Sequence, residues 1–262
     1  MTILDKILRE KRLEVERLLE EGIQVQNEYS TRPSLFEKLV NADHLQVIAE
    51  MKRASPSKGL IAEGANPIAQ AVAYENAGAA CISVLTDTPF FKGSFDDLAA
   101  VANVVETPLL CKDFIVDKVQ IDKAKAAGAS VILLIVAALN DKELLEFHQY
   151  AVAAGLEVLV EVHDAGELER ALKVDAKLIG VNNRDLRTFE VDLGRTEEIA
   201  AIFPFSEDRV LISESGITGQ TDAERVSTAG ARAILVGESL MRSGTIEESI
   251  ASMQVELPGV TQ

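Results

Sequence analysis

The sequence alternates eight times between short apolar runs and amphipathic segments, and this alternation restricts the fold more than any other feature. The apolar runs consist mainly of Val, Ile, Leu and Ala, which is typical of strands buried on both faces. Strands with helical crossovers between them indicate a parallel sheet covered by helices. The predicted strands are 47–51, 80–85, 108–112, 130–135, 156–162, 177–182, 209–213 and 232–236.

The segments between and after these runs show apolar residues at helical spacing. Several of them end in an alanine followed by a glycine, as at Gly78, Gly128, Gly155 and Gly230. A glycine in the left-handed conformation is a common C-terminal helix cap. The predicted helices are 68–77, 95–104, 118–127, 142–153, 165–172, 194–201, 220–229 and 246–253.

Eight strand–helix units in 262 residues predict an α/β fold, a closed (β/α)8 TIM barrel. A doubly wound sheet is the alternative. The Gly-x-Gly-x-x-Gly fingerprint of many doubly wound proteins follows none of the predicted strands. We see no interdomain linker and no low-complexity segment, so we predict one barrel domain over residues 1–262.

The first 45 residues precede the alternation and form a predicted helical extension. Residues 2–21 place Leu and Ile at helical spacing among charged residues, and Gly22 is a plausible end for this helix. A second short helix is predicted over 34–40, directly after Pro33. We expect both helices to cover an end or a side of the barrel, or to contact a partner.

Charge and composition exclude several classes of protein. The net charge of -16 argues against a nucleic-acid partner, which needs a basic surface. A small anionic substrate remains compatible, because a few focused cations can dominate a cleft. We expect no signal peptide and no membrane span, since the longest apolar run, 131–139, is too short. Cys81 and Cys111 lie in apolar strands and fit a reducing cytoplasm.

Glu50 and Lys52 interrupt the first apolar strand with opposite charges. Residues two apart share a strand face, so both side chains point the same way, while Met51 points the other way. In a (β/α)8 barrel the active site lies at the carboxyl ends of the strands. We therefore interpret the pair as the first wall of a polar site rather than a surface ion pair.

Later strands end in polar residues in the same manner. If Lys112 faces inward, its neighbour Cys111 faces the helices. Because burying charge is costly unless the charge is paired or used, convergence of such groups indicates an enzyme. The residues at these strand ends are Lys112, Glu161, Asn182, Arg184, Glu214 and Ser215.

Glycines after the last two strands suggest a phosphate site. Gly216 and Gly237 each precede a predicted helix, and the loops after strands seven and eight bind phosphate in many such barrels. We expect the backbone N–H of Glu238 to contribute while its side chain points away. The histidines lack metal-ligand spacing, and we expect His163 to lie on the opposite strand face from Glu161. We predict no metal.

These stretches closely resemble the indole-3-glycerol phosphate synthase family over nearly the whole chain. One long motif is Ile-Ala-Glu-Met-Lys-Arg-Ala-Ser-Pro-Ser-Lys-Gly at 48–59, and another is Gly-Val-Asn-Asn-Arg-Asp-Leu at 180–186. The other matching segments are 83–87, 91–94, 111–115, 159–163, 212–217 and 235–240. The resemblance includes a helical extension ahead of the first strand.

The resemblance implies a (β/α)8 enzyme of tryptophan biosynthesis that needs no cofactor. The family converts 1-(2-carboxyphenylamino)-1-deoxyribulose 5-phosphate into indole-3-glycerol phosphate, carbon dioxide and water. By motif, Lys112 resembles the general acid and Glu161 its acid/base partner. Lys52 is close enough to share the dehydration and to lie near the phosphate, and Glu50 orients the lysines. How Lys52, Lys112 and Glu161 divide the acid/base work stays open.

The resemblance also implies the groups that position the substrate and the phosphate. Ser55 is assigned to the carboxylate, and Phe91 and Phe114 to the aromatic ring, although loop packing explains the two rings equally well. Other tryptophan-pathway enzymes are candidate partners. The remaining implied substrate and phosphate groups are Asn182, Arg184, Glu214, Ser215, Gly216, Gly237 and Glu238.

Two rival functions remain open at this stage. Lys112 could form a Schiff base, as in a class I aldolase, or the barrel could bind a phosphate compound without turning it over. For the general-acid role, we expect desolvation or a neighbouring cation to lower the pKa of Lys112 toward neutrality.

Overall fold

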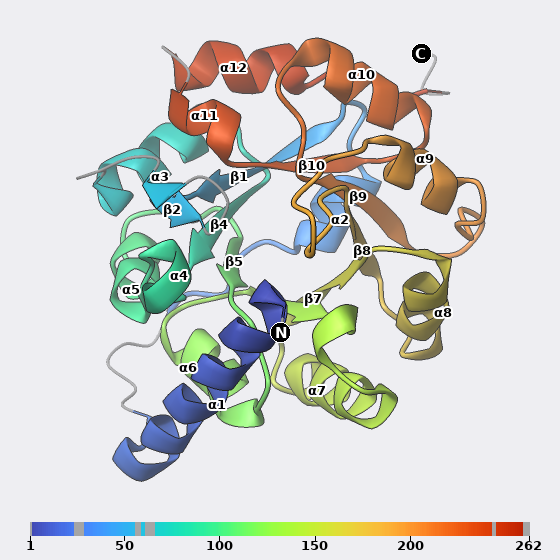
Figure 1. The fold of residues 1–262 in the computed structure, drawn as a ribbon. Helices are drawn as coiled ribbons and strands as arrows, with labels where there is room; N and C mark the ends of the chain where they lie inside the picture. Colours follow the sequence, from blue (N-terminus) through green and yellow to red (C-terminus); the bar gives the residue numbers. More distant parts are fainter. Residues whose placement is uncertain (1, 24–28, 56–58, 61–65, 243–244, 259–262) are drawn as a thin grey trace.

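Eight parallel strands close into a barrel in the computed structural model, which describes residues 2–23, 29–55, 59–60, 66–242 and 245–258 (Figure 1). Each strand pairs with its sequence neighbours, and β1 closes the ring by pairing with β10. The predicted (β/α)8 fold is confirmed, with every strand within one residue of its predicted ends. The strands are β1 (Gln46–Met51), β4 (Cys81–Leu85), β5 (Leu109–Lys112), β6 (Val131–Ile135), β7 (Glu157–Val162), β8 (Leu178–Asn182), β9 (Val210–Glu214) and β10 (Ala233–Val236).

Side chains alternate between the inside of the barrel and the layer under the helices. Ile48, Leu110 and Leu159 belong to the inner group of buried residues, whereas Val47 and Cys111 belong to the outer group. The expected outward direction of Cys111 is therefore confirmed. Both faces of each strand are buried, which explains why the sequence shows continuous apolar runs.

Helices surround the barrel, as Figure 1 shows. They begin mainly at side-chain caps, such as Asn66 before α3 and Asp117 before α6. The predicted helices are present with small differences at their ends. They are α3 (Pro67–Asn76), α5 (Phe95–Ala102), α6 (Lys118–Ala126), α7 (Asp141–Ala153), α8 (Ala165–Lys173), α9 (Gly194–Ala200), α10 (Gln220–Thr228) and α12 (Ile246–Met253).

Several short elements in the loops were not predicted from the sequence. Each is too short to show a periodic apolar pattern. They are the antiparallel pair β2 (Ala54–Ser55) and β3 (Gly59–Leu60), the helices α4 (Thr88–Phe91) and α11 (Glu238–Arg242), and the 3-10 turn η1 (Val136–Ala138).

The second N-terminal helix, α2 (Leu35–Val40), closes the amino-terminal end of the barrel. Its Leu35 and Leu39 are fully buried among the inner side chains of the strands. The carboxylate of Glu157, where β7 begins, accepts hydrogen bonds from the backbone N–H groups of Leu35 and Phe36. At the other end of α2, the guanidinium of Arg232 donates to backbone carbonyls, including that of Leu39.

The first helix, α1 (Ile3–Glu21), crosses the opposite end of the barrel and packs against α6 (Figure 1). Its only fully buried charged residue within the described part of the chain is Lys11, with 1% of its side chain exposed. The Lys11 ammonium lies 2.7 Å from Asp113, 2.8 Å from Glu14 and 3.2 Å from Asp87. One cation therefore attaches α1 to the loops after β4 and β5.

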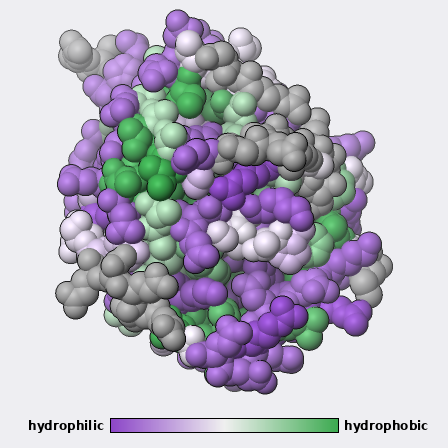
Figure 2. Space-filling model, turned by 90° about the vertical axis from the view of Figure 1, so that its left-hand side faces the viewer, coloured by the Kyte–Doolittle hydropathy of each residue, from purple (hydrophilic) through white to green (hydrophobic). Residues whose placement is uncertain are grey.

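The surface carries both hydrophilic and apolar residues. Hydrophilic residues cover most of the side shown in Figure 2, with a group of apolar residues among them. Within the described ranges, none of the helices has the length and apolar character needed to cross a bilayer.

We expect Lys11→Met to release α1 from the barrel. Asp87 and Asp113 are each only 1% exposed, and removing one partner of a buried ion pair costs about 3–5 kcal/mol. Native-state hydrogen exchange of the α1 amides measures this loss. The control is Lys6→Met at an exposed position of the same helix, which should change the protection of α1 little. Equal protection in both variants would contradict the anchoring role of Lys11.

Candidate active site

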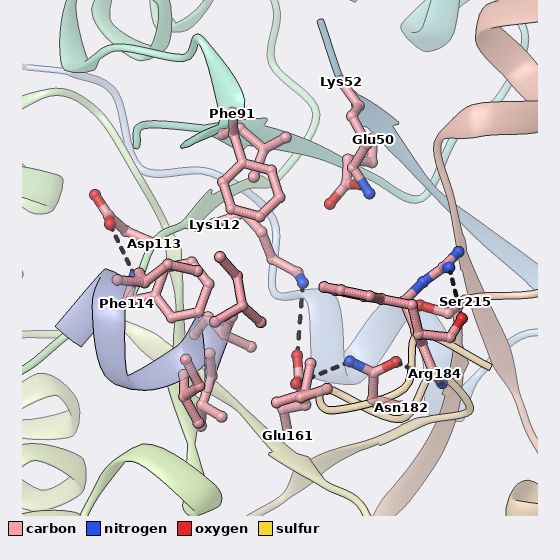
Figure 3. A pocket seen from close by; sticks show the side chains of 18 of the residues that line it. Glu50, Lys52, Phe91, Lys112, Asp113, Phe114, Glu161, Asn182, Arg184 and Ser215 are labelled. Atoms are coloured by element: carbon pink, nitrogen blue, oxygen red, sulfur yellow. Dashed lines mark hydrogen bonds and ion pairs between the residues drawn. The ribbon is translucent and has the colours of Figure 1, made fainter. Parts of the chain in front are cut away.

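A pocket opens at the carboxyl ends of the barrel strands, where an active site is expected in this fold (Figure 3). Side chains from β1, β5, β7 and β8 meet there with residues of α1 and of the loops. Most of the residues predicted from the sequence line it, namely Glu50, Lys52, Phe91, Lys112, Phe114, Glu161, Asn182, Arg184, Ser215 and Glu238.

Lys112 lies at the centre of a group of buried carboxylates. Its ammonium nitrogen is 3.4 Å from Glu214 Oε2 and 3.6 Å from Glu161 Oε2. Burial alone would lower the pKa of Lys112, but the carboxylates of Glu214, Glu161 and Glu50 outweigh it and raise the pKa. The expectation of a lowered pKa is therefore wrong, because sequence reasoning did not count the anions around the lysine.

Besides Lys112, two side chains contact Glu161. Its Oε1 accepts a hydrogen bond from Asn182 Nδ2 at 3.0 Å and lies 3.4 Å from His163 Nε2. Burial raises the pKa of Glu161, but Lys112 and His163 act against it and the pKa is lowered. The lowered pKa favours the ionised form of this carboxyl group, which lies between Lys112 and His163.

Glu50 and Lys52 point into the same pocket, as the two-residue strand period predicts. Lys52 Nζ is 2.6 Å from Glu50 Oε1, and Ser83 Oγ donates to Glu50 Oε2 at 3.5 Å. Burial raises the pKa of Glu50, but Lys52 and Lys112 lower it by more. Glu50 is therefore an anion between two lysines, and Lys52, a quarter exposed, is the more accessible of them.

Two glycines make room for these buried carboxylates. A Cβ atom on Gly180 would lie 2.0 Å from Glu214 Oε1, and one on Gly237 would lie 2.9 Å from Glu50 Oε1. Only a residue without a side chain lets β8 and β10 pass so close to the charged groups.

Glu214 lies behind Lys112 and is not among the described residues that line the pocket. Its side chain is 2% exposed. Burial raises the pKa of Glu214 to about 7, with Lys112 opposing the shift and the neighbouring carboxylates Glu161 and Glu50 adding to it. The group therefore changes its charge near neutral pH.

The Asn183 side chain orients the segment after β9. Its amide nitrogen donates to Ser213 Oγ and to the carbonyl oxygens of Glu214 and Ser215. Ser215 has φ 67°, in the left-handed region that a non-glycine residue rarely adopts. These bonds hold Ser215 at the pocket in spite of that conformation. Sequence reasoning did not single out Asn183, because it predicted only inward-facing residues.

The apolar part of the pocket comes from loops and from α1. The ring centroids of Phe91 and Phe114 are 5.9 Å apart. Figure 3 shows both rings on one side of the pocket. Apolar residues that the sequence analysis did not identify complete this wall. They are Ile3, Leu4 and Ile7 of α1, and Leu186 and Phe189 of the segment after β8. The amphipathic pattern of α1 identified its apolar face but not the surface that this face would cover.

The expectation for His163 is wrong. Its side chain lies on the same side as that of Glu161, with its two ring nitrogens near Glu161 and Glu167. The signal was present in the sequence, because residues 161 and 163 are two apart and therefore share a face while the chain stays extended.

Among the remaining predicted residues, Gly216 and Gly237 do not line the pocket. The side chain of Ser55 lies outside the described part of the structure. Gly216 has φ 86°, and a Cβ atom there would meet Val191 at 2.3 Å. A Cβ atom on Gly237 would likewise meet the side chain of Glu50. Within the described ranges, no group of three or more His, Cys, Asp and Glu residues is arranged to hold a metal ion.

Comparisons with known proteins agree along almost the full chain. The model of the family indole-3-glycerol phosphate synthase matches residues 4–253. The indole-3-glycerol phosphate synthase of Exiguobacterium sibiricum is 52% identical over 243 residues, covering 93% of both chains. That of Oceanobacillus iheyensis is 48% identical over 257 residues, covering 98% of both. That of Listeria monocytogenes serotype 4a is 50% identical over 257 residues, covering 97% of this chain and 99% of the relative.

A closed (β/α)8 barrel with buried lysines and carboxylates at the ends of its strands is an enzyme built for acid–base chemistry. The family match shows which family of such enzymes this is. The chain belongs to the indole-3-glycerol phosphate synthase family. It is a carboxy-lyase that forms indole-3-glycerol phosphate from a small phosphorylated substrate in tryptophan biosynthesis.

We expect Gly180→Ala to displace the Glu214 carboxylate. The added methyl group would overlap Glu214 Oε1, and overpacking of this kind costs about 1–3 kcal/mol. Because Glu214 is also a partner of Lys112, turnover should fall along with stability. Urea denaturation and kcat measure both effects. Gly219→Ala is the control, since a Cβ there meets nothing within 4 Å and should cost less than about 1 kcal/mol.

Glu214→Gln should change how stability depends on pH. The pKa of Glu214 is raised from 4.5 to about 7, so the wild type loses stability as pH rises through this interval and a buried charge forms. Glutamine does not ionise. The variant should therefore gain stability relative to the wild type between about pH 5 and about pH 8. Thermal denaturation across this pH range measures the gain in stability. Glu16→Gln, on the exposed face of α1, is the control. A constant difference would show that Glu214 does not titrate there.

Proposed function

We propose that Lys112 is the general acid that protonates the ribulose carbonyl as the aromatic ring attacks it. One observation carries this role, namely that the Lys112 ammonium lies in the pocket within 3.6 Å of two carboxylates. Ring closure develops negative charge on the carbonyl oxygen, so a positioned proton donor stabilises the transition state. The raised pKa keeps the donor protonated until the substrate's charge arrives.

Glu161 is the acid/base partner in this proposal. It is an anion in the free site and can accept a proton during rearomatisation. Lys52 shares the later dehydration, since it lies on the same pocket wall and is the more accessible lysine. Glu50 orients both lysines through its carboxylate.

The pocket walls position the substrate. Phe91 and Phe114 flank the aromatic ring, which is supported by their contact at the pocket. Asn182 and Arg184 align the sugar, with Asn182 donating to Glu161 and accepting from the backbone N–H of Arg184. Glu214 acts through Lys112, which is 3.4 Å away.

The remaining positions bind the substrate's anionic ends. Ser55 contacts the carboxylate in this proposal, and Ser215 contacts the substrate beside it. The backbone of Gly216, Gly237 and Glu238 holds the phosphate, with Lys52 nearby. Support comes from Ser215, Glu238 and Lys52, which line one pocket. Backbone N–H groups at a helix start bind such anions.

Residues 1–262 act as one domain in this proposal, with residues 1–45 as its extension. No cofactor is required, because decarboxylation restores the aromaticity of the ring without an electron sink. A cytoplasmic location fits the pathway and the unpaired cysteines. Other enzymes of tryptophan biosynthesis are candidate partners.

Lys112→Met tests the acid role against the Schiff-base rival. A Schiff base needs a neutral amine, which the raised pKa of Lys112 disfavours. Turnover should fall about 10²- to 10⁴-fold, with substrate binding retained. Lys118→Met, at an exposed ion pair, is the control and should keep full turnover. Borohydride with substrate should leave the wild-type mass unchanged, and an adduct on Lys112 would overturn the assignment.

Glu161→Gln tests the acid/base partner separately. Glutamine keeps the shape and the hydrogen bond to Asn182 but cannot exchange a proton. Turnover should again fall about 10²- to 10⁴-fold, while substrate affinity changes little. Single-turnover kinetics and equilibrium binding separate the two quantities. Near wild-type turnover would reject the role of Glu161.

A further inference from the structure

His163 joins the active-site carboxylate Glu161 to a second carboxylate outside the pocket. Its Nε2 atom is 3.4 Å from Glu161 Oε1, and its Nδ1 atom is 2.9 Å from Glu167 Oε2. Glu167 also accepts the backbone N–H of His163 at 2.8 Å and is itself fixed by a bond from its N–H to Asp164. The three side chains form a continuous row from β7 to α8.

Exposure rises along this row. The side chain of Glu161 is 3% exposed, that of His163 is 10% exposed and that of Glu167 is 17% exposed. His163 and Glu167 line a separate open groove, whereas Glu161 lines the substrate pocket. The row therefore runs from the substrate pocket to a second, more open groove.

The two ring nitrogens of His163 have different tasks. Glu167 faces Nδ1 at hydrogen-bond distance, so Nδ1 carries a proton and donates it to Glu167. The Nε2 atom is buried and has no hydrogen-bond partner within the described ranges. Its neighbour is the Glu161 carboxylate, whose lowered pKa favours the ionised form, so in the protonated imidazole the second proton is on Nε2 and faces Glu161 Oε1 at 3.4 Å.

The reaction itself requires a proton from outside. The substrate carries an ionised carboxylate, and this group is released as neutral carbon dioxide. The phosphate keeps its charge. Water is the other neutral product. Charge balance therefore requires uptake of one proton per turnover, in addition to protons that move within the site.

We propose that His163 relays this proton, passing it from Nε2 to the Glu161 carboxylate and regaining one from solvent beside Glu167. The proposal rests on the acid/base role proposed above for Glu161. In each transfer the N–H bond at Nε2 breaks as an O–H bond forms on Glu161. The resulting neutral imidazole keeps its Nδ1–H bond, so it is reloaded by turning about its Cβ–Cγ bond. The empty nitrogen then faces the groove and takes a proton from solvent, while the remaining N–H turns toward Glu161. His163 acts on the substrate only through Glu161 and does not contact the reacting atoms.

The charges around His163 favour its protonated form. Burial lowers the pKa of His163, but the hydrogen bond to Glu167 and the carboxylates of Glu161, Glu167 and Glu214 raise it overall. Charges of both signs line the groove on its far side. Besides Glu167, the charged residues of the groove are Asp164, Arg170, Asp185, Arg187, Asp192, Arg195 and Glu198. The relay should therefore stay loaded to a higher pH than an ordinary histidine would, and lose its proton as pH rises through the raised pKa.

His163→Gln is the first test. Glutamine can donate a hydrogen bond to Glu161 but cannot transfer a proton. We expect kcat to fall about 10- to 100-fold, less than for a direct acid/base group, with KM changed less than about twofold. The alkaline limb of the kcat–pH profile should disappear. The control is His148→Gln on α7, a buried histidine away from the site, which should keep the wild-type profile. An unchanged kcat and profile in His163→Gln would overturn the relay.

Chemical rescue separates proton transfer from packing. In His163→Ala the groove side of the site is open, so added imidazole should restore kcat in proportion to its concentration. Pyrazole has the same ring size but is not protonated at neutral pH, and it should not restore activity. Rescue by neither compound, or by both equally, would overturn the proposal.

Glu167→Gln tests the solvent-facing end of the row, at a residue that does not line the substrate pocket. Loss of this anion destabilises the imidazolium, so the alkaline limb should move to lower pH. An unmoved limb would contradict the row of three groups.

The double variant His163→Gln/Glu161→Gln keeps the two proposals apart. It should be no slower than Glu161→Gln alone, because the relay acts only through Glu161. If Glu161→Gln keeps full turnover, the proposed acid/base role fails. If Glu161→Gln is slow but His163→Gln is not, only the relay fails.

Discussion

The balance of charge around Lys112 is the interaction on which the site depends. A buried ammonium is stable only beside anions, and a buried carboxylate only beside cations or donors. Lys112 with Glu161 and Glu214 satisfies both conditions, and each of the three comes from a different strand. The barrel is needed for this arrangement, because its closure brings β5, β7 and β9 to one mouth.

The N-terminal helices complete the barrel at its two ends by different means. Helix α2 fills the amino-terminal end with the apolar side chains of Leu35 and Leu39, and Glu157 and Arg232 bind the backbone at its two ends. Helix α1 is attached to the catalytic end by the buried charge of Lys11. Asp113, which binds Lys11, directly follows Lys112, so the attachment of α1 and the position of Lys112 depend on one segment of the chain.

Much of the fold and part of the site were predictable because both follow local periodicity. Continuous apolar runs defined all eight strands, and the two-residue period placed Glu50 and Lys52 on one face. The same period applied to His163 would have placed it beside Glu161. The short loop elements and Phe189 were not predictable, since loop conformation depends on contacts with distant segments.

The sequence by itself determined the barrel, the residue types at the strand ends and the family. Buried strands appear as continuous apolar runs, and the family motifs are contiguous stretches of sequence. Only the tertiary structure decided the protonation of Lys112, since its pKa depends on carboxylates more than 45 residues away in sequence. It also decided that Gly180 and Gly237 make room for carboxylates. Charge–charge energies and excluded volume depend on distances in space, which no local pattern encodes.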